Sequence, residues 1–281
     1  MKVRIITAVV MAIVGVPLLV FSDTWIYPIA AGLLCLCSVY EILNCLKLQA
    51  KLLIAIPAYL IAALLPFFGY KFFFGIDEQL NYILIAALVM FAFLIYLTFA
   101  AVLSRGTVTV REVGLSYATI YYIVASFAAL VMLRYMQYGE TLFLMVFIIA
   151  WVSDGAAYFV GTFLGKTKLA PDISPKKTVE GSIGGVLFAT AAAVVYGVII
   201  ELAVPAVRAN YLVLALLGFG LSIVSQVGDL WASLIKREYG IKDFGWILPG
   251  HGGIFDRFDS VLSVCTPLMV ACIFFPPFIA A

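Results

Sequence analysis

YILIAALVMFAFLIYLTFAAVL, residues 82–103, contains no charged side chain, and this stretch decides the fold class. An α-helix needs about 20 mostly apolar residues to cross a bilayer, and this stretch supplies them. The whole chain of 281 residues is 65% hydrophobic and 11% charged, whereas soluble domains carry about 45–50% apolar and 25% charged residues. The sequence therefore predicts an all-α, polytopic integral membrane helix bundle.

Similar segments recur along the chain and predict about nine transmembrane helices. The predicted helices are 4–22, 25–46, 52–69, 82–103, 115–134, 141–164, 182–204, 211–237 and 258–279. The third segment is short and the eighth is long, which leaves counts of eight and ten open. The longest polar stretches are the loops 165–181 and 238–257.

Lysine and arginine gather in one set of loops, and this sets the predicted orientation, because cytosolic loops carry an excess of these residues. With the N-terminus in the cytosol, all of the 17 Lys and Arg residues fall on the cytosolic side except Lys71, Arg134 and Arg208. Both long polar loops then lie in the cytosol, where nucleotides are found. We divide the chain into an N-terminal helical scaffold, 1–135, and a C-terminal catalytic region, 136–281, which contains both loops.

The predicted helix 211–237 carries a polar stripe along one face. Its members follow one another at helical spacing: Ser222, Ser225, Gln226, Asp229, Ser233, Lys236 and Arg237. An aspartate inside a bilayer costs about 2.5 kcal/mol or more, so the stripe that contains Asp229 is expected to face a wet cavity or a bound cation. The alternative is an internal ion pair with Lys236 or Arg237. Asp154 is a second acid of this kind, whereas Glu41 is expected to extend toward the cytosolic end of its helix, with no chemistry assigned.

Cations and glycines follow closely after this helix, in a pattern typical of phosphate binding. The residues are Lys236-Arg237, Lys242-Asp243-Phe244-Gly245, Pro249-Gly250-His251-Gly252-Gly253, Asp256-Arg257 and Asp259. Glycine lets backbone N–H groups approach a phosphate closely, and a helix start favours an anion. His251 is the only histidine, and we assign it to phosphate or loop contact rather than to acid–base catalysis.

Asp256 and Asp259 lie three residues apart at the start of the last predicted helix, so they share a face. Carboxylates beside phosphate-binding cations are typical Mg²⁺ ligands, because Mg²⁺ takes one or two carboxylates together with phosphate oxygens. The alternative is that these acids only complement the helix dipole.

The loop 165–181 contains Ser174-Pro175-Lys176-Lys177-Thr178, which predicts a stiffened turn that offers two cations and two hydroxyls. Taken alone, its charges are better explained as a topology signal. The glycine pairs Gly161/Gly165 and Gly181/Gly185 predict close helix packing rather than phosphate loops. The sequence holds no Walker-type loop, Rossmann fingerprint or nucleophile elbow.

The chain contains the run Ser233-x-x-Lys236-Arg237-x4-Lys242-Asp243-x-Gly245-x3-Pro249-x-His251-Gly252-Gly253-x-x-Asp256-Arg257-x-Asp259. This run resembles the signature of the phosphatidate cytidylyltransferases, without a departure. Ser174-Pro175-Lys176-Lys177-Thr178-x-Glu180-Gly181 is similar to a second stretch of that family. The resemblance covers the chain from about Asp154 onward, whereas the first 110 residues match only in being hydrophobic helices.

The resemblance implies an enzyme that converts CTP and phosphatidate into CDP-diacylglycerol and pyrophosphate with Mg²⁺, in an all-helical membrane fold that forms a homodimer. We assign metal binding to Asp229, Asp256 and Asp259. The catalytic set is Asp229, Asp256, Lys236 and Arg237. The substrate-binding set is Ser174, Lys176, Lys177, Thr178, Glu180, Ser233, Lys242, Asp243, His251, Gly252, Gly253 and Arg257. The expected location is the bacterial inner membrane, with the active site facing the cytosol, the bilayer as partner and no nucleic acid.

Two rival classes share some of these features. A transporter of an anionic solute also has many helices and buried acids, but its polar residues would lie at mid-depth in related halves. Here they gather toward one membrane face. A CDP-alcohol phosphotransferase needs Asp-Gly followed by Ala-Arg, whereas Asp154-Gly155 runs into Ala156-Ala157-Tyr158, so we reject that class.

Overall fold

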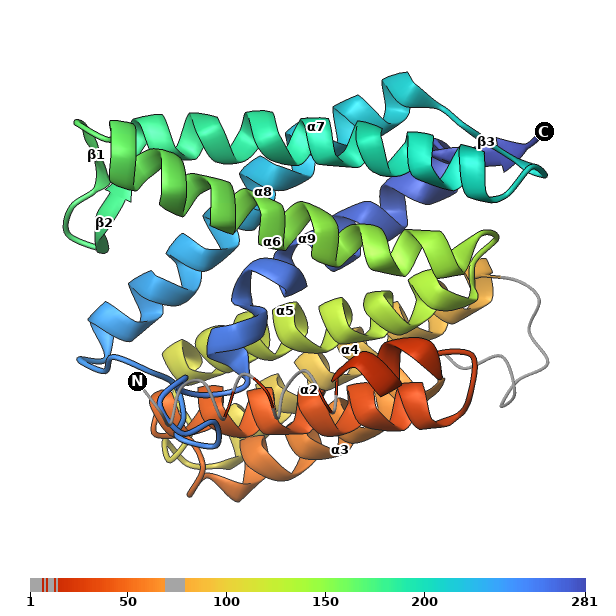
Figure 1. Ribbon diagram of the computed structural model, residues 1–281. Helices are drawn as coiled ribbons and strands as arrows, with labels where there is room; N and C mark the ends of the chain where they lie inside the picture. The colour runs from red at the N-terminus through yellow and green to blue at the C-terminus, as the bar shows by residue number, and fades with distance from the viewer. Residues whose placement is uncertain (1–6, 8, 10–12, 14, 69–78) are drawn as a thin grey trace. The chain divides into compact units, whose positions relative to one another are not determined.

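A computed structural model describes residues 7, 9, 13, 15–68 and 79–281, and it is a bundle of α-helices with two small β-sheets (Figure 1). The helices of the described residues are α2 (Ile26–Cys45), α3 (Leu52–Phe68), α4 (Gln79–Leu103), α5 (Val110–Tyr135), α6 (Gly139–Leu164), α7 (Val179–Ala203), α8 (Tyr211–Glu238) and α9 (Phe255–Phe274). The strands are β1 (Lys168–Ala170), β2 (Ser174–Thr178), β3 (Val207–Ala209) and β4 (Phe278–Ala280).

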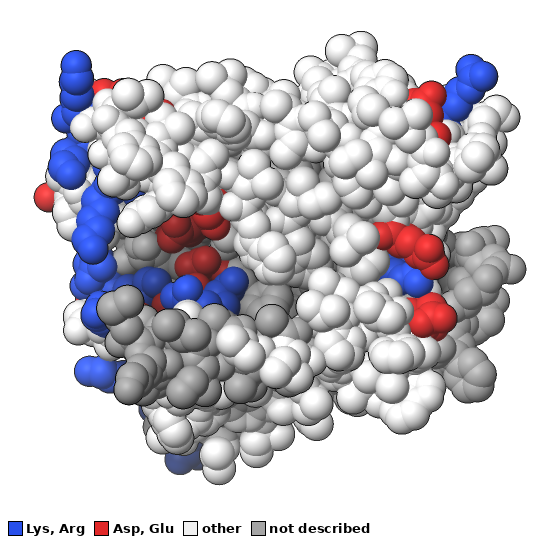
Figure 2. Space-filling model, viewed as in Figure 1, with Lys and Arg blue, Asp and Glu red and all other residues white. Residues whose placement is uncertain are grey.

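The predicted class, a polytopic helical membrane protein, is confirmed. Within the described residues, seven helices are long and apolar enough to cross a membrane, and α3 is a shorter apolar helix. Most of the predicted helix 4–22 lies outside the described residues, although 15–20 is helical. The count of about nine and the cytosolic N-terminus therefore stay predictions. Most of the face shown in Figure 2 carries neither basic nor acidic side chains, as a lipid-facing surface requires.

The chain divides into two compact units. The first unit contains 1–135 and 239–257, and the second contains 136–238 and 258–281. The break after Tyr135 coincides with the boundary drawn from the sequence. The segment 239–257, which the sequence grouped with the C-terminal region, belongs to the first unit together with the N-terminal helices.

In the first unit, α2 packs against α3 and α5, and α4 packs against α3 and α5. Its centre is filled by fully buried side chains such as Val39, Ile42 and Ile123. Polar links tie the helices together at their ends: Lys51 Nζ lies 2.6 Å from Glu112 Oε1, and Arg134 Nε donates to Ser22 Oγ at 2.8 Å.

In the second unit, α7 packs closely along α6 and α8. Gly161 and Gly181 allow the approach of α6 and α7, because a Cβ at Gly181 would lie 2.6 Å from Ala157 O and 3.0 Å from Gly161 Cα. The predicted packing role of these glycines is confirmed.

The loop 165–181 is not only a turn, because β1 and β2 pair in an antiparallel hairpin at one end of α6 and α7 (Figure 1). Glu180 fixes the start of the hairpin, because its carboxylate accepts hydrogen bonds from Lys166 N and Thr167 N, both at 3.1 Å. The sequence analysis missed the strands because Pro175 and two lysines give β2 little β-propensity.

The predicted helix 258–279 is displaced at both ends. Pro276 and Pro277 cannot continue a helix, so α9 ends at Phe274 and Phe278–Ala280 pairs with Val207–Ala209 as a second sheet. At the other end α9 begins at Phe255, three residues early, because its first N–H groups find a carboxylate partner that is described below.

Candidate active site

Three carboxylates from separate helices of the second unit lie within mutual electrostatic reach: Asp154 of α6, Asp229 of α8 and Asp259 of α9. We call them the acidic cluster. Lys177, from the end of β2, places Nζ 2.6 Å from Asp229 Oδ2. Lys236 interacts electrostatically with Asp259. Carboxylates this close repel one another unless cations stand between them, so the cluster is built to hold positive charge.

Small residues bring the helices of the acidic cluster together. A Cβ at Gly228 would collide with the side chain of Ser263 and would lie 3.2 Å from Asp259 O, so glycine lets α8 approach α9 next to Asp229. Asp259 is only 8% exposed, and its Oδ1 accepts from Ser260 N at 2.8 Å. Asp154 in turn accepts a hydrogen bond from the Ser260 side chain.

Within the polar stripe on α8, Gln226 faces protein partners on α6 and α7. Gln226 Oε1 accepts from Ser182 Oγ at 2.6 Å, and its Nε2 donates to Ser182 O at 3.1 Å and to Ser153 Oγ at 3.4 Å. The expectation of a wet cavity is therefore wrong for Gln226, whose polar groups are satisfied by α6 and α7. For Asp229 the partner is Lys177 rather than the Lys236 or Arg237 considered from the sequence. Ser233 Oγ lies 3.5 Å from Asp229 Oδ1.

The predicted substrate residues of the β1–β2 hairpin divide by role. Thr178 caps α7, since its Oγ1 accepts from Gly181 N at 3.1 Å, and Glu180 fastens the hairpin base. Ser174 is half-buried and Lys176 is exposed. Arg237 Nε reaches the hairpin from the end of α8 and donates to Ile173 O at 3.2 Å. These contacts explain Thr178 and Glu180 structurally, and their contact with substrate stays a prediction.

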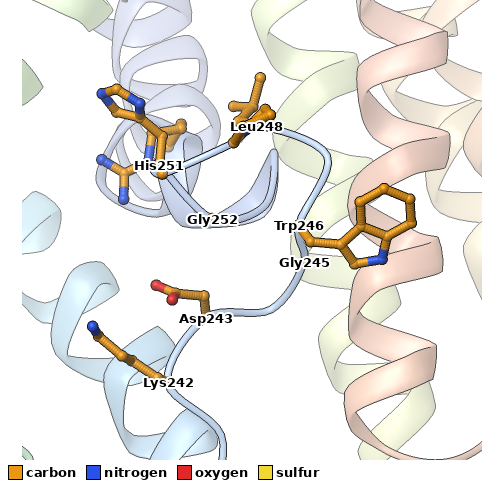
Figure 3. Close-up of a pocket in the computed structure, with 10 residues that line it drawn as sticks. Lys242, Asp243, Gly245, Trp246, Leu248, His251 and Gly252 are labelled. Atoms are coloured by element: carbon orange, nitrogen blue, oxygen red, sulfur yellow. The ribbon is translucent and has the colours of Figure 1, made fainter. Parts of the chain in front are cut away.

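In the first unit, the segment 239–257 forms a pocket of about 550 Å³ (Figure 3). Its lining includes Lys242, Asp243, His251, Gly252 and Arg257, all of which the sequence predicted for substrate. Figure 3 shows the side chains of Lys242, Asp243 and His251 on one side of the loop, whereas Trp246 points away from them. Within the described residues, His251 Nδ1 is buried and makes no hydrogen bond. This nitrogen and the neighbouring cations suit an anionic ligand.

Asp256 turns toward the backbone of its own segment. Its Oδ2 accepts from Phe244 N at 2.7 Å and from Gly253 N at 3.0 Å, and the residue is 6% exposed. Of the three predicted metal ligands, Asp229 and Asp259 belong to the acidic cluster of the second unit. Asp256 belongs to the first unit, where it organises the segment that carries His251.

Sequence reasoning assigned no role to Glu41 and missed its partners in the segment 239–257. The residue is 1% exposed, and its carboxylate accepts from Ile254 N at 2.9 Å and from Phe255 N at 2.8 Å. The available signal was the acid itself, because an ionised group within an apolar helix needs a partner elsewhere in the protein.

The residues present fit Mg²⁺ only in company with substrate. Within the described part of the chain, no three His, Cys, Asp or Glu side chains are arranged to hold a metal, so a cage made of protein alone is absent there. Mg²⁺ usually takes one or two carboxylates and completes its octahedron with water and phosphate oxygens. Asp229 and Asp259 supply such a donor pair, with Lys177 already bound to one oxygen of Asp229.

The chain is a helical membrane protein whose acidic cluster lies beside lysines and whose first unit has a pocket lined by Lys242, His251 and Arg257, features that suit phosphate-bearing ligands. The sequence profile of the cytidylyltransferase family matches residues 2–275. The chain belongs to this family, and it is a nucleotidyltransferase.

Curated relatives extend over nearly the whole chain. The chain is 39% identical over 273 residues to a phosphatidate cytidylyltransferase of Bacillus subtilis, covering 94% of each protein. It is 33% identical over 278 residues to the protein of the same name from Staphylococcus haemolyticus, covering 97% of this chain and 99% of the relative. A Brucella suis phosphatidate cytidylyltransferase is 47% identical over 132 residues, 47% of this chain. None of these relatives supports the transporter alternative.

Proposed function

We propose that this protein transfers the cytidylyl group of CTP to phosphatidate, with CDP-diacylglycerol and pyrophosphate as products. The observation that carries the proposal is the match to phosphatidate cytidylyltransferases over nearly the full length of both chains. The anion-binding character of the pocket and the acidic cluster with its lysines support it, because both substrates are phosphate esters.

The nucleophile requires no base from the protein. A phosphate monoester has a second pKa near 6 and is largely dianionic at neutral pH. Its oxygen attacks the α-phosphorus of CTP, and the bond to the pyrophosphate oxygen breaks. The remaining barrier comes from repulsion between two polyanions and from charge that builds on the leaving group, both of which positioned cations reduce.

The residues divide this work by their chemistry. Basic side chains contact the phosphate oxygens. In the second unit these are Lys176, Lys177, Lys236 and Arg237, and in the first unit they are Lys242, His251 and Arg257. Asp229 and Asp259 would hold Mg²⁺, with Asp256 a further predicted ligand. When bound, Mg²⁺ would neutralise phosphate charge and orient the two phosphates. Asp154 accepts a hydrogen bond from the Ser260 side chain and interacts electrostatically with Asp229. It therefore adds negative potential at the proposed Mg²⁺ ligands.

The setting follows from the substrates. Phosphatidate keeps its acyl chains in the bilayer, and CTP arrives from the cytosol, so the loops 165–181 and 238–257 face the cytosol in this proposal. The relatives are bacterial, which favours the inner membrane. A homodimer is part of the proposal.

The test is a direct assay of the purified protein with radiolabelled CTP, phosphatidate and Mg²⁺ in detergent micelles. We expect lipid-soluble label that requires phosphatidate and is absent with Asp229→Asn. Label that stays in the aqueous phase for the wild-type protein would contradict the proposal.

A further inference from the structure

Glu41 is a buried acid that the proposed reaction does not use. It lies near the end of α2, 213 residues before the first of its two hydrogen-bond donors. Of the two donors, Phe255 N is the first N–H group of α9, and Ile254 N belongs to the residue directly before the helix. Such groups have no partner within their own helix, and the positive end of the helix dipole favours a carboxylate there. Glu41 therefore caps α9 from a distant helix.

Two glycines let the Glu41 carboxylate reach this position. A Cβ at Gly245 would collide with Glu41 Oε1, and a Cβ at Gly253 would collide with both carboxylate oxygens. Neither glycine has a positive φ, so closeness to Glu41, and not backbone conformation, accounts for glycine at both positions. The carboxylate is thus enclosed between two points of the segment 239–257.

A second carboxylate binds the same segment from within. Asp256 Oδ2 accepts from Phe244 N and Gly253 N, so Glu41 and Asp256 together receive four backbone N–H groups. The rings of Phe244 and Phe255 pack at 4.8 Å between centroids, which closes the apolar side. Both ends of the stretch 246–252 are fixed in this way, and His251 lies on that stretch.

We infer that Glu41 is a positioning residue: it fixes the segment 239–257 so that Lys242, His251 and Arg257 present one pocket to a phosphate ligand. The inference rests on the proposed function for its consequence in activity, but the positioning itself is a property of the folded protein. Glu41 lies against Gly245 of the pocket lining, but its hydrogen bonds go to the backbone of Ile254 and Phe255, and it acts through them.

The test compares Glu41→Gln with Glu112→Gln. Glu112 is a matched control in the same unit, because its carboxylate also accepts a backbone N–H, from Thr109, and its ion-pair partner is Lys51, so these partners lie outside 239–257. In Glu41→Gln the side-chain NH2 group, which can only donate, faces one of the two backbone N–H donors, Ile254 N or Phe255 N. We expect exchange of the amides of 253–255 to rise about tenfold or more by hydrogen-exchange mass spectrometry. We expect kcat/KM for CTP to fall by about tenfold to a hundredfold, whereas Glu112→Gln leaves both unchanged.

Each outcome decides one claim. Unchanged exchange in Glu41→Gln would overturn the positioning, and raised exchange with unchanged kcat/KM would overturn its role in activity. If wild-type protein transfers no cytidylyl group, the proposed function fails, while the exchange comparison still decides whether Glu41 holds the segment.

A size-exchange experiment reads the contact itself, and its first variant, Gly245→Ala, leaves Glu41 in place and serves if Glu41→Gln is not recovered in folded form. Gly245→Ala pushes a methyl group against Glu41 and should raise exchange at 253–255. In a Glu41→Ala background the same methyl meets no carboxylate, so its effect on kcat/KM should largely vanish. An equal loss in both backgrounds would show that the contact does not matter, since contacting residues give non-additive effects.

Discussion

Replacing Lys177 by Met should make the enzyme need less Mg²⁺ and bind CTP more weakly. Lys177 Nζ lies 2.6 Å from Asp229 Oδ2, with side chains 25% and 27% exposed. If Asp229 holds the metal, ammonium and metal compete for the same oxygen. Exposed ion pairs contribute about 0.2–1 kcal/mol, and breaking a buried pair costs about 3–5 kcal/mol. A pair that is one quarter exposed lies between, at about 2 kcal/mol, which corresponds to about 30-fold in an equilibrium constant.

We therefore expect Lys177→Met to lower the half-saturating Mg²⁺ concentration by up to about 30-fold. The KM for CTP should rise, because a cation that contacts phosphate is lost. Initial rates of lipid-soluble label are measured over a Mg²⁺ series at saturating phosphatidate. Lys168→Met, which removes an exposed charge from the same hairpin, is the control and should change neither constant. A Mg²⁺ requirement that rises or stays the same in Lys177→Met would refute a shared Asp229.

Three further predictions concern the acids, the topology and the histidine. Asp229→Asn should abolish turnover with the fold intact. Asp256→Asn should also lose activity and cost about 1–3 kcal/mol of unfolding free energy from weakened backbone hydrogen bonds, measured by thermal unfolding. Near-normal activity of either variant at ordinary Mg²⁺ would contradict its assignment. Single cysteines at Thr167 and Tyr239, in a background without the native cysteines, should be shielded from an impermeant thiol reagent in intact cells; labelling of both would overturn the cytosolic placement. His251→Gln should keep measurable activity and an acid limb near pH 6, set by the phosphate itself, whereas a loss of about 10²–10⁴-fold with no acid limb would indicate a general base.

Periodicity and apolar length were sufficient for the helices, because both are local properties of the chain. The predicted helix 211–237 agrees with α8 within one residue, and 141–164 agrees with α6 within two. The start of α5 is an error of another kind: the helix begins at Val110, five residues before the predicted start, where Thr109 and Glu112 form a local cap. Two further errors fall where a partner far along the chain decides the local structure. The strand Phe278–Ala280 depends on Val207–Ala209, and the early start of α9 depends on Glu41.

The site residues show the same division. Spacing alone identified the carboxylates and cations, since charged groups in an apolar chain stand out and their chemistry is known. It did not pair them: Asp229 binds Lys177 rather than a cation of its own helix, because a hairpin formed by a distant segment brings Lys177 there. Nor did it separate acids that bind backbone, such as Asp256, from acids that face other carboxylates, such as Asp259.

Gly245 and Gly253 illustrate how far a local reading of a motif can be trusted. From spacing they suggested close approach of backbone to phosphate, since glycine permits such an approach. In the structure the space left by each missing side chain is filled by the Glu41 carboxylate. A negative group in that space repels a phosphate, and the backbone N–H groups of Gly253, Ile254 and Phe255 already donate to carboxylates. We therefore expect phosphate binding in this segment to depend on the side chains of Lys242, His251 and Arg257, positioned by the acid that the glycines admit.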